Sequence, residues 1–160
     1  MMDLGKGNPK MRITLGLALA VLATCAQAAP SGGLPTRAEA RAMLAKAVAF
    51  YKKNGRDEAL DAFNRRKPPF SSQGLYVFCI GPDRKLVADG EFHEFIGQSA
   101  DLIKDASGKP LGQSFWDMAQ KKGHGEMHYQ FLDPTTHLIK PKVSYFEKIE
   151  SDVCSVGTYE

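Results

Sequence analysis

The alternation of hydrophobic and polar positions predicts that the folded part of the chain begins with a helix. Apolar residues recur at three- and four-residue spacing between Met43 and Tyr51, which is typical of an amphipathic helix with one buried face. Thr36 followed by Glu39 forms a capping box that begins this helix. The Asn-Gly pair at 54–55 ends it, because both residues tolerate the left-handed backbone conformation.

Further along, the pattern changes to short aromatic and β-branched runs separated by turns, which predict strands. Five strands are expected, over 75–80, 85–89, 125–131, 142–149 and 153–159. A short helix over 58–63, capped by Asp57, precedes them. The segment between the second and third strands is irregular at first and ends in a helix over 115–122, capped by Ser114.

This order of elements predicts one α+β domain. The expected architecture is a five-stranded antiparallel sheet with the long first helix on one face and the helical insert over the other. An insert that lies over a sheet face encloses a pocket. A solid, fully packed core is the alternative outcome.

The N-terminal segment has the composition of an export signal. Arg12 precedes an apolar run over 13–24, and an Ala-Gln-Ala sequence at 26–28 supplies small residues at the cleavage positions. The run is shorter than the about 20 residues that a membrane span needs. We therefore expect a periplasmic protein with a signal peptide over 1–28, Met11 as its true start, a linker over 29–35 and one domain over 36–160.

A cysteine near the cleavage site offers an alternative route of processing. The sequence Leu-Ala-Thr-Cys at 22–25 resembles a lipoprotein cleavage box, which would anchor the protein to lipid through Cys25. Thr is poorly tolerated just before such a cysteine. The preferred interpretation is therefore that Cys25 is removed with the signal peptide.

Charge and cysteine content narrow the function classes. The chain has 21 Lys and Arg against 18 Asp and Glu, a balance that indicates neither a nucleic-acid partner nor general membrane adhesion. Two cysteines remain after the signal peptide, Cys79 and Cys154. In an exported protein such a pair predicts a disulfide, and two separate buried thiols are the alternative.

Familiar catalytic and metal-binding motifs are missing from the sequence. It contains no Gly-x-Ser-x-Gly, no phosphate-binding loop and no His-Glu-x-x-His. His124 and His128 are four residues apart, but a strand would separate them by about 13 Å. We therefore predict no enzyme activity, no cofactor and no metal site.

Ten short motifs occur along the chain in an order that a known family shares. They are AFYKKNG at 49–55, ALDAFN at 59–64, LYVF at 75–78, ADG at 88–90, IG at 96–97, KD at 104–105, GKP at 108–110, DP at 133–134, PKVSY at 141–145 and GTY at 157–159. Together, over about residues 47–159, they resemble the single Cache domain, an extracytoplasmic PAS-like sensor module of bacteria.

The resemblance implies a PAS-like sheet with a small-molecule pocket beneath the insert, which commonly takes small organic acids. Such domains usually feed a transmembrane helix and a receptor or kinase, whereas this chain stops one residue after Tyr159. The resemblance therefore implies a free-standing sensing module with a membrane receptor or kinase as its partner. Long Cache helices often pair, whereas the first helix here is short, so we expect a monomer or weak dimer. The chain departs from the family at Asp89, where His is usual, and a carboxylate facing the pocket would repel an acid.

Lys142 is the first candidate for ligand binding, because it matches the Pro-Lys-x-x-Tyr piece of the family. A lysine at a pocket wall offers a charge and hydrogen-bond donors to a carboxylate, and a solvated surface lysine is the alternative. Tyr145 follows three residues later. A regular strand would turn Tyr145 to the face opposite Lys142, so both line one pocket only if a bulge intervenes or Lys142 precedes the strand.

Aromatic residues supply the other candidates, with core packing as the alternative for each. They are Phe115 and Trp116 on the insert helix, Tyr76 and Phe78 on the first strand, and Tyr129 on the third. The predicted function is periplasmic binding of a small organic acid. The alternative is a structural or protein-interaction module with a filled pocket.

Overall fold

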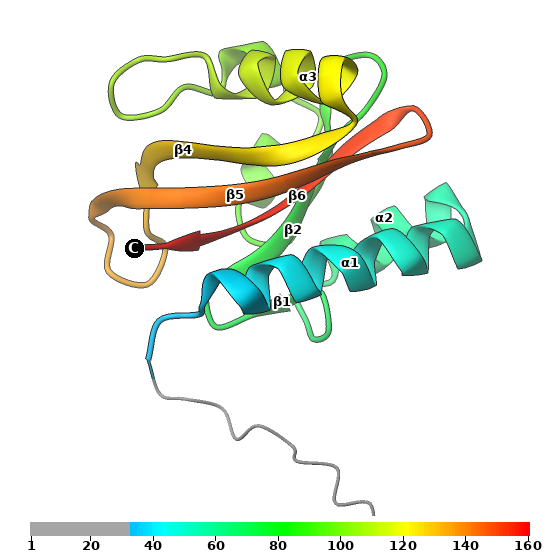
Figure 1. The fold of residues 1–160 in the computed structure, drawn as a ribbon, viewed down its shortest axis with the longest axis horizontal. Helices are drawn as coiled ribbons and strands as arrows, with labels where there is room; N and C mark the ends of the chain where they lie inside the picture. Colours follow the sequence, from blue (N-terminus) through cyan, green and yellow to red (C-terminus); the bar gives the residue numbers. More distant parts are fainter. Residues whose placement is uncertain (1–32) are drawn as a thin grey trace, which may run out of the picture. The chain divides into compact units, whose positions relative to one another are not determined.

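The computed structural model describes residues 33–160, which form an antiparallel sheet with helices on both faces (Figure 1). The predicted signal peptide over 1–28, with Met11 and Cys25, and most of the linker lie outside the described residues. Their processing therefore stays a prediction.

Helix α1 spans Arg37–Asn54 and begins at the predicted capping box. The hydroxyl of Thr36 accepts a hydrogen bond from the backbone N–H of Glu39 at 3.2 Å, and the N–H of Thr36 donates to the Glu39 carboxylate at 2.7 Å. Gly55 ends the helix with a φ of +85°, a conformation that costs glycine little. The buried face of α1 consists of Ala40, Met43, Leu44, Ala47, Val48 and Tyr51.

The sheet contains the five predicted strands and one short strand that the sequence did not indicate. The strands are β1 (Ser71–Ser72), β2 (Leu75–Ile80), β3 (Leu86–Asp89), β4 (His124–Leu132), β5 (Ile139–Ile149) and β6 (Asp152–Tyr159). Their order is β1-β2-β6-β5-β4, with β3 also paired to β2, and every pairing is antiparallel. The unexpected β1 has only two residues, which is too short for a hydrophobic pattern to reveal.

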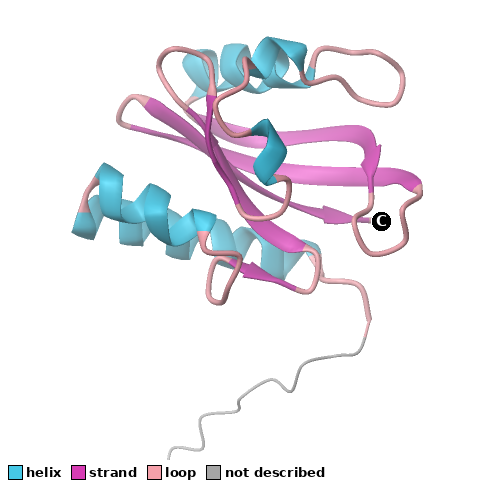
Figure 2. Ribbon diagram, turned by 180° about the vertical axis from the view of Figure 1, so that it is seen from behind, coloured by secondary structure: helices cyan, strands magenta, loops and turns pink. Residues whose placement is uncertain are grey.

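The two faces of the sheet carry separate hydrophobic cores. Helix α1 and the following α2 (Arg56–Asn64) cover one face, while helix α3 (Leu111–Lys122) covers the other (Figures 1 and 2). Two 3-10 turns, η1 (His93–Phe95) and η2 (Ala100–Leu102), belong to the insert that contains α3. The predicted α+β architecture, with the long helix and the insert on opposite faces, is thus confirmed.

Two helix starts differ from the sequence prediction. Helix α2 begins at Arg56, directly after Gly55, and Asp57 does not cap it. Helix α3 begins at Leu111, four residues early, and the hydroxyl of Ser114 donates to the Pro110 carbonyl instead of capping the helix. Tertiary packing explains the early start, since the first turn of α3 lies so close to η2 that a Cβ at Gly112 would meet the Ala100 backbone.

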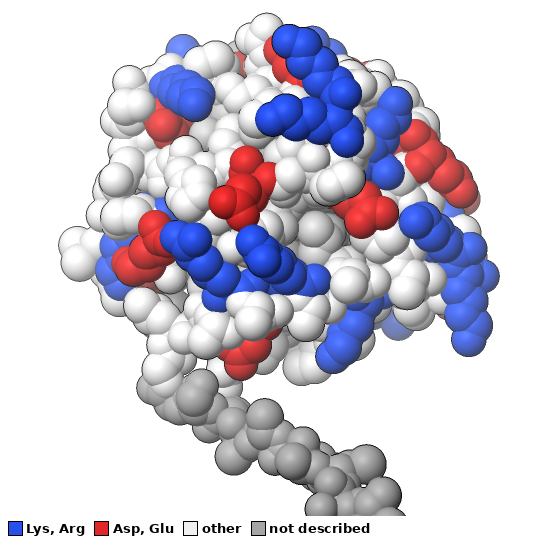
Figure 3. All heavy atoms as spheres, viewed as in Figure 1, with Lys and Arg blue, Asp and Glu red and all other residues white. Residues whose placement is uncertain are grey.

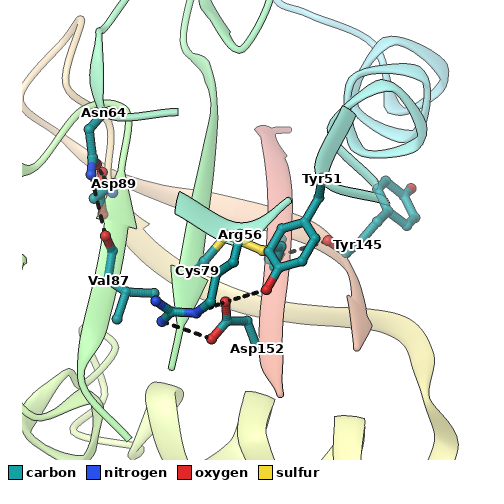
Figure 4. The surroundings of a disulfide bond; sticks show 10 residues. Tyr51, Arg56, Asn64, Cys79, Val87, Asp89, Tyr145 and Asp152 are labelled. Carbon is teal, nitrogen blue, oxygen red and sulfur yellow. Dashed lines mark hydrogen bonds and ion pairs between the residues drawn. A yellow bond between two sulfur atoms is a disulfide. The ribbon is translucent and has the colours of Figure 1, made fainter. Parts of the chain in front are cut away.

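A disulfide joins two strands of the sheet, and a buried carboxylate fixes α1 and α2 to it (Figure 4). Cys79 on β2 and Cys154 on β6 are direct cross-strand partners and form the disulfide. Asp152, at the start of β6, is fully buried. It accepts hydrogen bonds from the Tyr51 hydroxyl at 2.8 Å and from Arg56 Nε at 2.9 Å.

The surface carries both charge signs side by side. Figure 3 shows Lys and Arg interspersed with Asp and Glu across the face viewed in Figure 1. None of the helices within residues 33–160 combines the length and the apolar character needed to cross a membrane.

Candidate ligand-binding site

A small cavity lies between the sheet and the insert, on the face opposite α1. Its volume is about 40 Å³, which is space for about three water-sized groups. The wall is largely aromatic, formed by Tyr76, Phe78, Phe95, Phe115, Tyr129 and Phe131. Such a site suits a ligand of few atoms that is mostly sheltered from water.

Four of the aromatic candidates from the sequence meet in this wall. Tyr76 and Phe78 come from β2, Phe115 from α3 and Tyr129 from β4. The ring of Phe115 packs edge-on against Phe78 at 5.3 Å and against Tyr129 at 5.8 Å between centroids. These contacts hold the insert helix against the sheet, so the same rings act as core and as cavity wall.

Lys142 lies directly behind the cavity wall, on β5. Its side chain is only 1% exposed, and its ammonium donates hydrogen bonds to the hydroxyls of Tyr76 at 2.7 Å and Tyr159 at 3.4 Å. The ammonium also sits over both rings, 4.3 and 4.6 Å from their centroids, positions in which the ring faces attract a cation. Within residues 33–160, no carboxylate lies within 4 Å of it.

Burial dominates the chemistry of Lys142. Loss of water lowers the pKa of its ammonium to about 7, while the negative charge of Asp89 acts in the opposite direction. A buried positive charge without a carboxylate partner is costly. A bound anion would therefore stabilise the protonated form of Lys142.

The neighbouring strand leaves room for this lysine. Tyr159 on β6 pairs with Lys142 in the sheet register, and Gly157 lies two residues before it. A Cβ at Gly157 would come within 2.8 Å of the Lys142 Cε. The glycine therefore lets the lysine chain pass over β6 toward Tyr76.

Asp89 also lines the cavity, at the end of β3. Its side-chain Oδ1 accepts hydrogen bonds from the backbone N–H groups of Glu91 at 2.9 Å and Phe92 at 2.7 Å. Burial raises the pKa of the Asp89 carboxyl, and the two amide donors and the charge of Lys142 oppose that rise. The cavity region therefore contains a cation and an anion that are not paired with each other.

Two candidates lie elsewhere than the sequence predicted. Lys142 and Tyr145 are both inside the regularly paired β5, so they point to opposite faces of the sheet. Tyr145 lies beneath α1, with the guanidinium of Arg41 4.4 Å from its ring centroid. Trp116 is half-buried against the core on the insert side, but it does not line the cavity.

Three aromatic participants were not among the candidates, and the first is Phe95, which lies in the wall at the end of η1. Phe131 lies in the wall beside Tyr129, as the alternation along β4 would allow. Tyr159 was noted only as part of the last motif, and its contact with Lys142 follows from the β5–β6 register, which the sequence does not specify.

No metal centre is visible in the part of the chain that the structure describes, since no three His, Cys, Asp or Glu side chains gather there as ligands. His124 and His128 both lie on β4. The ring of His128 is 3.4 Å from the Glu126 carboxylate.

Comparison with solved structures places the fold among chemotaxis sensor domains. A periplasmic sensor domain of a chemotaxis protein is 20% identical, with a TM-score of 0.56, covering 74% of this chain and 86% of its own. A methyl-accepting chemotaxis protein from Vibrio parahaemolyticus RIMD 2210633 is 19% identical, with a TM-score of 0.63, covering 76% and 86%. A Cache chemosensory domain, described with its recognition of carboxylic acids, is 18% identical, with a TM-score of 0.57, covering 74% and 84%.

Sequence comparison gives the family directly. No curated protein matches the chain significantly. The family described as Single Cache domain 2 matches residues 6–159, a longer stretch than the motifs at 47–159 indicated. With its sheet, insert and cavity in the arrangement that the motifs implied, the chain belongs to the single Cache domain family.

Proposed function

We propose that this domain is a periplasmic sensing module that binds a small organic acid. The observation that carries the proposal is the buried ammonium of Lys142, which has no carboxylate within 4 Å in the described residues and lies one side chain away from the cavity. An acid ligand would supply the missing negative charge.

Tyr76 connects the cavity to Lys142. The phenol oxygen of Tyr76 accepts a hydrogen bond from Lys142 at 2.7 Å, and Tyr76 itself lines the cavity. A ligand carboxylate would accept the phenol O–H, while the lysine charge behind it strengthens that donor. Tyr129, Phe78 and Phe115 would exclude water around the rest of the ligand.

The solved relatives support a sensing role. They are described as sensor domains of chemotaxis proteins, and one is described with its recognition of carboxylic acids. By this proposal the domain is not an enzyme. As a monomer or weak dimer, it would pass ligand occupancy to a membrane receptor or kinase.

A thermal-shift screen of purified protein against small organic acids tests the proposal. Ligand at 100 times its dissociation constant is expected to add about 2.7 kcal/mol of stability, a rise of several degrees in Tm. In Lys142→Met, which keeps the volume and removes the charge, the rise should disappear. Lys148→Met is the matched control, because Lys148 lies on the same strand and is exposed.

One observation favours the alternative of an interaction module without a ligand. The cavity of about 40 Å³ is small for a metabolite. A folded protein that is silent across the acids would support that alternative. A shift that Lys142→Met leaves unchanged would place the ligand elsewhere.

A further inference from the structure

Asp89 is the one charged side chain among the residues that line the cavity within the described chain. It is only 4% exposed. Both of its backbone donors bind Oδ1, and in the described residues Oδ2 has no hydrogen-bond partner and no ion pair. Among the described side chains, only the Tyr145 hydroxyl is a fully buried polar atom without a partner, so Oδ2 of Asp89 keeps some accessible surface where Asp89 lines the cavity. A ligand that displaces water from the cavity would leave Oδ2 unsatisfied unless it brings a donor of its own.

The position of Asp89 is fixed from two sides. The side-chain oxygen of Asn64, at the end of α2, accepts the backbone N–H of Asp89 at 2.9 Å, and its amide donates to the Val87 carbonyl at 3.3 Å (Figure 4). The following residue, Gly90, packs against β2 so closely that a Cβ there would be 3.1 Å from the Cβ of Tyr76. Asp89 and Tyr76 therefore border the same small volume.

We propose that the ligand carries a hydrogen-bond donor that Oδ2 of Asp89 accepts, so that the site selects a small hydroxy or amino acid over the plain carboxylic acid of the same length. This inference rests on the proposed function, in which Tyr76 and Lys142 bind the acid group of the ligand. A plain acid would leave Oδ2 without a partner and bring a second negative charge toward it. A hydroxyl or ammonium on the carbon next to the acid group would offer Oδ2 a donor with the fewest added atoms, as a cavity of about 40 Å³ requires.

Calorimetric titration with matched ligands tests this selection on the purified protein. The set is acetate, glycolate and glycine, then propionate, lactate and alanine, with ethanolamine as a donor that lacks the acid. We expect at least one donor-bearing acid to bind about tenfold or more tighter than its plain counterpart, because sites built around a polar contact reject analogues that lack it.

The variant Asp89→Asn isolates the contribution of Oδ2. Its amide keeps an acceptor for Glu91 and Phe92 but presents a donor to the cavity, so the preference should vanish or reverse toward the plain acid. Asp101→Asn, an exposed carboxylate in the insert that pairs with Arg84, is the control for loss of charge and should keep the preference. Circular dichroism confirms that each variant is folded.

The possible results separate the two proposals. If plain acids bind as tightly as donor-bearing acids, or if Asp89→Asn keeps the preference, the role of Asp89 is refuted while acid binding stands. If only ethanolamine binds and Asp89→Asn abolishes it, Asp89 is the donor-binding group and the acid proposal is refuted. If nothing binds, both proposals are overturned.

Discussion

At the scale of single residues, Lys142 shows how burial sets the conditions for binding. Its pKa is lowered to about 7 by loss of water. Between that value and the ordinary value near 10.5, the unfolded chain holds a proton that the folded chain lacks. The contribution of Lys142 to the stability of the ligand-free protein therefore rises with pH across this interval.

Ligand binding has the opposite dependence on pH. An acid needs Lys142 in its charged form, so we expect affinity to be constant just below pH 7 and to fall above it, by up to about tenfold per pH unit. The charged groups near Lys142 all favour its protonated form, and they are Asp89, Asp133 and Glu91. Titration calorimetry on both sides of pH 7, in two buffers that differ in ionisation enthalpy, measures the affinity and the proton taken up.

Two results of that titration are informative. The variant Lys148→Met should show the same pH dependence as the unchanged protein, because the exposed ammonium that it removes lies away from the cavity. A flat affinity from pH 6 to about 9 would contradict a role for the Lys142 charge.

Some residue placements were predictable from the chain and others were not. Simple alternation along a strand anticipated that Lys142 and Tyr145 would face opposite sides. The sequence pattern of the insert could not place Trp116 outside the cavity, because the rotation of α3 depends on its early start and on packing against η2. Asp89 was recognised only as a departure from the family, and its free oxygen appears only when the turn after β3 is folded.

At the scale of elements, the corner between α1 and α2 depends on one buried carboxylate. Asp152 accepts hydrogen bonds from the Tyr51 hydroxyl of α1 and from the Arg56 guanidinium of α2. Asp152→Ala is expected to cost about 1–3 kcal/mol, since the fully buried Tyr51 hydroxyl loses its partner. Denaturant unfolding measures this loss. Asp57→Ala, which removes an exposed carboxylate 3.9 Å from Arg56, should change stability little.

The same comparison decides the role of this corner. If Asp152→Ala were no more destabilising than Asp57→Ala, the buried network would not hold the helices to the sheet. The corner itself was only half predictable. Gly55 marked the end of α1, but the immediate start of α2 depends on Arg56 reaching a carboxylate 96 positions away.

At the scale of the whole molecule, the sheet separates two cores that a sensor would have to connect. The cavity and the insert lie on one face, and α1 and α2 lie on the other. Asn64 provides a direct link, because its side chain joins the end of α2 to the backbone of β3 at Val87 and Asp89. A ligand that binds Asp89 would therefore also stabilise the C-terminal end of α2.

Hydrogen exchange tests this link in the purified protein with the best-bound acid. At 100 times the dissociation constant, amides of the insert and β2 whose exchange requires opening of the site should slow by up to about 100-fold. Slowing should extend to the last turn of α2, while amides in the first turns of α1, which exchange by local fraying, stay unchanged. In Asn64→Ala, ligand should still slow exchange in the insert but should no longer slow it at the end of α2.

Two other outcomes would contradict this link. Equal slowing in the first turns of α1 would indicate that ligand affects only global unfolding. An insert whose exchange does not slow would place the ligand outside the cavity.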